Sequence, residues 1–71
     1  MEDKQIFNPL LMAGEVRHSV FSLILAMRPG GNLRAETDSV TMFLKSFGYS
    51  DSYIQGAIAY ARQEYVRQNT R

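Results

Sequence analysis

Gly48 separates two segments in which apolar residues recur at the three- and four-residue spacing of an α-helix. The segment before it carries Val40, Phe43, Leu44 and Phe47, and the segment after it carries Ile54, Ala57, Ile58, Ala61 and Tyr65. Glycine often ends a helix because it adopts the left-handed backbone conformation without steric cost. The pattern predicts a helix, a glycine turn and a second helix that pack together as a hairpin.

A further helix is expected earlier in the chain. Asn8 and Pro9 match a helix start, with asparagine as N-cap and proline in the first turn, and the loop sequence of residues 29–32 would end this helix at about Arg28. The candidate caps are Asn32, Thr37 or Asp38 for the second helix and Ser50 or Asp51 for the third. We predict an all-α fold, a three-helix bundle over residues 8–67, with residues 1–7 as a flexible N-terminal arm and 68–71 as a frayed C-terminus.

The composition limits the possible chemistry. The 71 residues include no cysteine and one histidine, so a disulfide or a thiolate metal site is excluded, and we expect no cofactor. Eight Lys and Arg stand against seven Asp and Glu, without the basic excess typical of nucleic-acid binding. Glu2 and Asp3 do not match a signal peptide, and the apolar run from Val20 to Met27 is too short to span a bilayer. We therefore expect a cytoplasmic protein without membrane contact.

The first helix carries more apolar residues than one packing face requires. One face holds Ala13, Val16, Val20, Leu23, Ile24 and Met27, and a second ridge holds Leu11, His18, Phe21 and Leu25. One interpretation is that the other two helices wrap around this helix and cover both faces. We favour a second copy of the chain on the second ridge, because a large exposed apolar patch is unusual on a monomer. The expected state is a homodimer.

Tyrosines recur along the third helix, away from its apolar stripe. Tyr53, Tyr60 and Arg67 follow at intervals of seven, with Gln63 beside them. Tyrosine and arginine are favoured at the centres of protein interfaces, so these four residues are our candidate protein-binding site. The alternative is that the two tyrosines pack against the first helix or the N-terminal arm with their hydroxyls in water.

The hairpin also resembles the helix-turn-helix motif of DNA-binding proteins. Gly48 lies at the turn glycine, and the matching apolar positions are Phe43 and Phe47 before it and Ile54 and Ala57 after it. The resemblance implies a DNA-binding transcriptional regulator in which Ser52, Gln55, Arg62, Arg67 and Arg71 contact DNA. Two departures weigh against this alternative. Leu44 stands where the motif prefers a small residue, and Asp51 places a carboxylate at the start of the recognition helix, where it would repel phosphate.

The titratable residues do not form a catalytic pattern. Glu15, His18 and Ser22 follow one another along a single helix, whereas acyl-transfer chemistry requires such groups to converge on one point. We therefore predict that the chain is not an enzyme and has no small-molecule substrate. The function expected from the sequence is that of a protein-binding adaptor, inhibitor or regulator that occupies a surface of a larger macromolecule.

Overall fold

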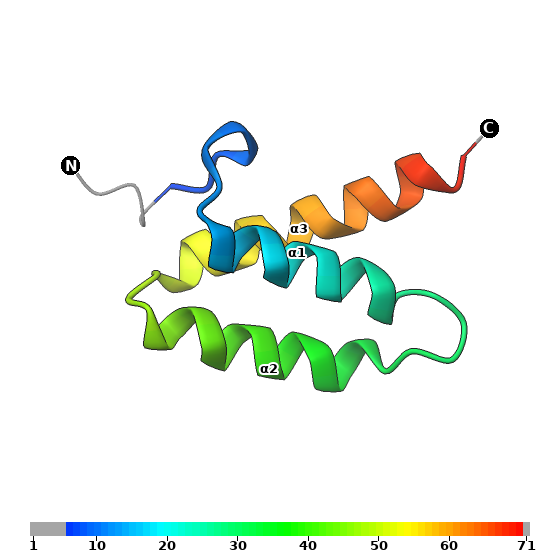
Figure 1. Cartoon of the computed structure of the whole chain (residues 1–71), viewed down its shortest axis with the longest axis horizontal. Helices are drawn as coiled ribbons and strands as arrows, with labels where there is room; N and C mark the ends of the chain where they lie inside the picture. Colours follow the sequence, from blue (N-terminus) through cyan, green and yellow to red (C-terminus); the bar gives the residue numbers. More distant parts are fainter. Residues whose placement is uncertain (1–5, 71) are drawn as a thin grey trace.

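Three packed α-helices make up the computed structural model, which describes residues 6–70. A short 3-10 helix, η1 (Pro9–Leu11), precedes α1 (Gly14–Ala26), α2 (Leu33–Ser46) and α3 (Asp51–Gln68). Helix α1 packs against both other helices, and α1 and α2 run side by side in opposite directions (Figure 1). The prediction of an all-α, three-helix bundle is confirmed. Within residues 6–70, no helix combines the length and apolar character needed to cross a bilayer.

At the start of α2 and at the start of α3, one of the capping residues proposed from the sequence caps the helix. The Asn32 side chain accepts a hydrogen bond from the Ala35 N–H at 3.1 Å, and the Ser50 hydroxyl accepts one from the Tyr53 N–H at 3.1 Å. Each bond satisfies an N–H group that has no partner within its helix. Of the candidate caps in the sequence, Asn32 and Ser50 therefore define where the helices begin.

The first helix starts later than its sequence predicts. Asn8 caps only η1, its side chain accepting from the Leu10 N–H at 3.0 Å. The chain is then extended at Met12 and Ala13, where ψ is 129° and 164°, and α1 begins at Gly14. The interruption lets Met12 pack against the core. Continuing the helix would also place Gly14 in its interior, which is unfavourable by about 1 kcal/mol relative to alanine.

Gly48 adopts a φ of 94°, in the left-handed region, between α2 and α3. Its N–H donates to the carbonyl of Lys45 at 2.9 Å, and the Tyr49 N–H donates to the carbonyl of Leu44 at 3.2 Å. These two bonds form the Schellman arrangement, which satisfies carbonyls at the end of a helix. Leu44 and Tyr49, the two positions where an apolar contact often accompanies this arrangement, are both buried in the core.

All three helices contribute to one core. The buried apolar residues are Val16, Val20, Leu23, Ile24, Val40, Leu44, Tyr49, Tyr53, Ile54, Ala57, Ile58 and Ala61. Ser19 is the buried polar residue of this region, and its hydroxyl donates to the carbonyl of Glu15 at 2.9 Å. Ala13, which we expected on the same face, is exposed. Within the described part of the chain, no buried side-chain nitrogen or oxygen lacks a hydrogen-bond partner.

Tyr49 joins the turn after α2 to the first turn of α1. Its hydroxyl donates to Oε2 of Glu15 at 2.6 Å, across 34 positions of the sequence. Burial, followed by the hydrogen bond to the Glu15 carboxylate and its negative charge, raises the pKa of the Tyr49 phenol well above its usual value. The bond therefore favours the protonated phenol, and the stability of the fold should decrease as the pH rises into the alkaline range.

Candidate functional site

The outer face of α1 is apolar and exposed. Phe21 has 59% and Leu25 has 43% of its surface exposed, and His18 is exposed on the same side of the helix. Helices α2 and α3 cover only the opposite face, so the interpretation in which they wrap around α1 is wrong. Leu11, the fourth residue of the expected ridge, is 68% exposed but belongs to η1 and is not part of the α1 face. We call Phe21, Leu25 and His18 the α1 ridge.

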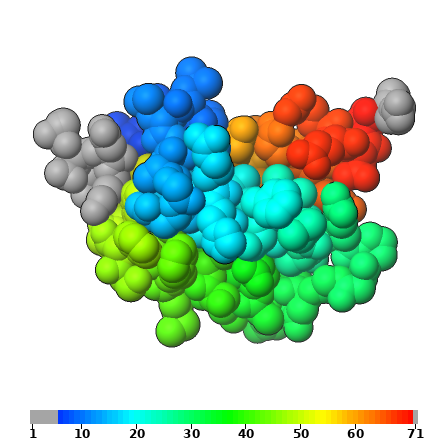
Figure 2. Space-filling view, viewed as in Figure 1, coloured from blue at the N-terminus to red at the C-terminus, as the bar shows by residue number. Residues whose placement is uncertain are grey.

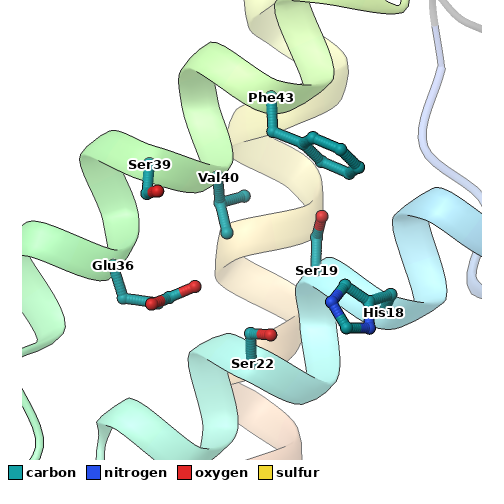
Figure 3. A pocket seen from close by; sticks show the side chains of 7 residues that line it. All are labelled: His18, Ser19, Ser22, Glu36, Ser39, Val40 and Phe43. Carbon is teal, nitrogen blue, oxygen red and sulfur yellow. The ribbon is translucent and has the colours of Figure 1, made fainter.

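A groove of about 220 Å³ lies between the α1 ridge and α2. It is lined by His18, Ser19, Ser22, Glu36, Ser39, Val40 and Phe43. In Figure 3 the Glu36 carboxylate and the Phe43 ring both extend from α2 toward α1, and α3 lies behind them. The floor of the groove is therefore core, whereas its rim carries a carboxylate, an imidazole and two serine hydroxyls.

Two phenylalanines extend this apolar surface along α2. Phe43 is 41% and Phe47 is 42% exposed, and their ring centroids lie 5.0 Å apart in an edge-to-face arrangement. On the face of the molecule that Figure 2 shows, side chains of α1 and α2 lie next to one another. We call the α1 ridge, Phe43 and Phe47 the docking face. From the sequence we placed both phenylalanines in the apolar stripe of the helix before Gly48, so their contribution to this exposed face was not predicted.

The tyrosine line on α3 is covered by the chain itself. Phe7 lies over Gly56, with its ring centroid 5.4 Å from that of Tyr53 and 5.5 Å from that of Tyr60. Tyr53 is only 3% exposed and Tyr60 is half-buried. The structure thus agrees with the alternative interpretation, in which the tyrosines pack against the N-terminal arm. Tyr53 is not a surface residue that could bind a partner in this arrangement.

The other candidate residues of this line lie further along α3. Gln63 is exposed, and Arg67 is held by Glu64, with Nε 3.2 Å from Oε2 and a terminal nitrogen 2.5 Å from Oε1. The hydrogen bond from Arg67 lowers the pKa of the Glu64 carboxyl. The charge of Arg67 is therefore already partnered on its own helix. Residues 1–5 of the predicted arm lie outside the described residues, whereas Phe7 is packed.

Replacing Gly56 by alanine is expected to release the arm without unfolding the bundle. A β-carbon at Gly56 would lie 2.8 Å from Cβ of Phe7, so the arm must move away. Alanine gains about 1 kcal/mol of helix propensity, which offsets much of the roughly 1–2 kcal/mol lost with the Phe7 contacts. The free energy of unfolding should change by less than about 1 kcal/mol. Amide hydrogen exchange over residues 6–13 should become faster.

Phe7→Ala is the matched variant, because it removes the same contact from the other side and gains no helix propensity. It should accelerate exchange over the same residues and lower the free energy of unfolding by about 1–2 kcal/mol. Unchanged exchange over residues 6–13 in the Gly56 variant would contradict the docked position of Phe7.

The residues of the DNA-binding alternative do not form a basic surface. Ser52, Gln55 and Arg62 are exposed on α3, Arg67 is paired with Glu64, and Arg71 lies outside the described residues. The exposed Asp51 carboxylate lies 3.0 Å from Nζ of Lys45. The helix that would read base edges thus begins with an acidic residue. Among the candidate residues that the structure describes, Arg62 is the one cation outside an ion pair.

The polar residues of the groove do not form a catalytic relay. His18, Ser22 and Glu36 share the groove, but no hydrogen bond joins any two of them in the described structure. Glu15 lies on the same helix as His18 and Ser22, and its carboxylate instead accepts a hydrogen bond from the Tyr49 hydroxyl. Residues 6–70 contain no group of three or more histidine, cysteine, aspartate or glutamate residues that could hold a metal ion. The chemistry that the groove offers is polar recognition beside an apolar surface.

Comparison of the chain with protein-family models, with curated proteins and with solved structures gives no match.

Proposed function

We propose that this chain is a protein-binding module, an adaptor, inhibitor or regulator that acts by occupying a surface of a larger macromolecule. The observation that carries the proposal is the docking face, where four large apolar side chains are each more than two-fifths exposed on two neighbouring helices. These are Phe21, Leu25, Phe43 and Phe47. Exposed apolar surface of this kind, bordered by polar groups, is typical of protein interfaces.

The same face suits the homodimer expected from the sequence. A two-fold axis would bring the α1 ridges of two copies together, and the added burial would help a chain whose own core is small. A target protein and a second copy would then compete for Phe21 and Leu25. Self-association would in that case keep the free module inactive at high concentration.

Replacing Phe21 by aspartate tests the docking face. The new carboxylate would have to be desolvated without a partner, so we expect association to weaken by at least about 2 kcal/mol, or roughly 30-fold. The matched control is Met42→Asp, because Met42 is 73% exposed on α2 but does not line the groove. Sedimentation measures self-association, and affinity capture from the native host with mass spectrometry measures binding to other proteins.

We expect the wild type and the Met42 variant to self-associate and to capture the same proteins, and the Phe21 variant to lose both. Equal behaviour of the Phe21 and Met42 variants would exclude the docking face. If all three proteins instead captured duplex DNA with an affinity that falls steeply with salt, the helix-turn-helix alternative would replace this proposal.

A further inference from the structure

We propose that the groove between α1 and α2 receives one lysine or arginine side chain of the protein partner. This inference rests on the proposed docking face, and it adds the chemical class of the partner residue that enters the groove. The partner would present an amphipathic segment in which a basic residue is flanked by apolar ones. The argument comes from the charge, the walls and the size of the groove.

The charge of the groove comes from Glu36. It is half-buried in the first turn of α2, and its carboxylate points into the groove (Figure 3). The ion pairs of residues 6–70 are Lys45 with Asp51 and Arg67 with Glu64, so Glu36 has no cation within the described chain. A partner cation would therefore complete an interaction that the chain itself leaves open.

The walls of the groove suit a long basic side chain. Lysine and arginine lay their methylene groups along apolar surface while the charged end stays at a polar site. Val40 and the Phe43 ring offer such a surface, and the ring face also attracts a cation. Ser22 and Ser39 also line the groove, and their hydroxyls can accept hydrogen bonds from the N–H groups of the basic side chain that do not bind Glu36.

The size of the groove favours a single side chain over a small molecule. Its volume of about 220 Å³ is below the roughly 300–1,000 Å³ of typical small-molecule pockets. Exposed apolar side chains lie on the same two helices as the groove, with Phe21 and Leu25 on α1 and Phe47 beyond Phe43 on α2. A partner residue in the groove would therefore have neighbours in contact with apolar surface, and this explains why the expected segment is both basic and apolar.

The test is selection of displayed random peptides on the wild-type protein, followed by affinity measurement of the selected peptides. We expect sequences with one Lys or Arg among large apolar residues. Glu36→Gln should weaken their binding about tenfold or more, because it removes the charge and keeps the shape. Asp38→Asn is the matched control, since Asp38 is exposed on α2 outside the groove, and it should change the affinity less than twofold.

The outcomes separate this inference from the proposed function. Peptides that lose binding to Phe21→Asp but carry no basic residue, or that bind Glu36→Gln unchanged, would overturn the groove inference and leave the docking face in place. Failure to select any peptide whose binding depends on Phe21 would overturn both. If Glu36→Gln weakens self-association of the chain and Asp38→Asn does not, the basic residue comes from a second copy, and the inference is supported.

Discussion

Shortening Leu23 to alanine is expected to lower the free energy of unfolding by about 2–5 kcal/mol. Leu23 is fully buried on α1, the helix that packs against both others, so its loss leaves a cavity at the centre of the bundle. A domain of this length has a total stability of about 4–10 kcal/mol at the usual stability per residue. For values in the middle of these two ranges the variant loses about half of the total stability, which urea denaturation measures.

Leu25→Ala is the matched control, with the same chemical change two positions further along the same helix. Leu25 is 43% exposed on the outer face, so the expected loss is about 1 kcal/mol or less. Because Leu25 belongs to the docking face, this variant should instead weaken association. Equal losses of stability in the two variants would contradict the orientation of α1 in the bundle.

Replacing Tyr49 by phenylalanine is expected to lower the free energy of unfolding at neutral pH, and this difference from the wild type should shrink or change sign at alkaline pH. At neutral pH the variant loses the hydrogen bond to the Glu15 carboxylate, which lowers the free energy of unfolding by about 1–2 kcal/mol. Above about pH 10 the wild type loses stability, because the phenol ionises more readily in the unfolded chain than in the fold. Phenylalanine cannot ionise, so the variant avoids this loss.

The sign of the effect follows from the raised pKa of Tyr49 in the folded chain. The stability that it contributes is fully present below the unfolded pKa and declines as the pH rises toward the folded value. Urea denaturation at several pH values would show the two stability curves converging or crossing. Tyr65→Phe is the control, since the Tyr65 hydroxyl makes no hydrogen bond within residues 6–70. Parallel curves for the wild type and the Tyr49 variant would exclude the proposed role.

The periodicity of the apolar residues was sufficient to predict the three helices and most of the core. Val16, Val20, Leu23 and Ile24 are buried as expected, because a helical face follows directly from residue spacing. The start of the first helix was wrong because a proline after an asparagine cap suits a 3-10 turn as well as an α-helix. After that turn the chain is extended at Met12, which packs against the core through a tertiary contact that local sequence does not encode.

The candidate site was predictable only in part. The surplus of apolar residues on the first helix was evident from the sequence, but whether the other two helices cover it was left open, and the structure leaves Phe21 and Leu25 exposed. Glu36 was missed because its place in the groove depends on how α2 packs against α1. The burial of Tyr53 was left open, since it depends on Phe7, which lies 46 positions earlier. Contacts between distant segments therefore set the limit of sequence reasoning here.

The packing of α1 against both other helices also bears on how the chain folds during synthesis. α3 supplies Ile54, Ala57, Ile58 and Ala61 to the core, and these residues are translated after α1 and α2. The ribosome adds the 18 residues of α3 in about 1–4 seconds at typical rates of elongation. During that interval the part of α1 that packs against α3 lacks this cover, and the outer ridge of α1 is exposed as well. Chaperones that bind apolar segments would therefore meet this chain while part of the inner face of α1 and its outer ridge are both uncovered.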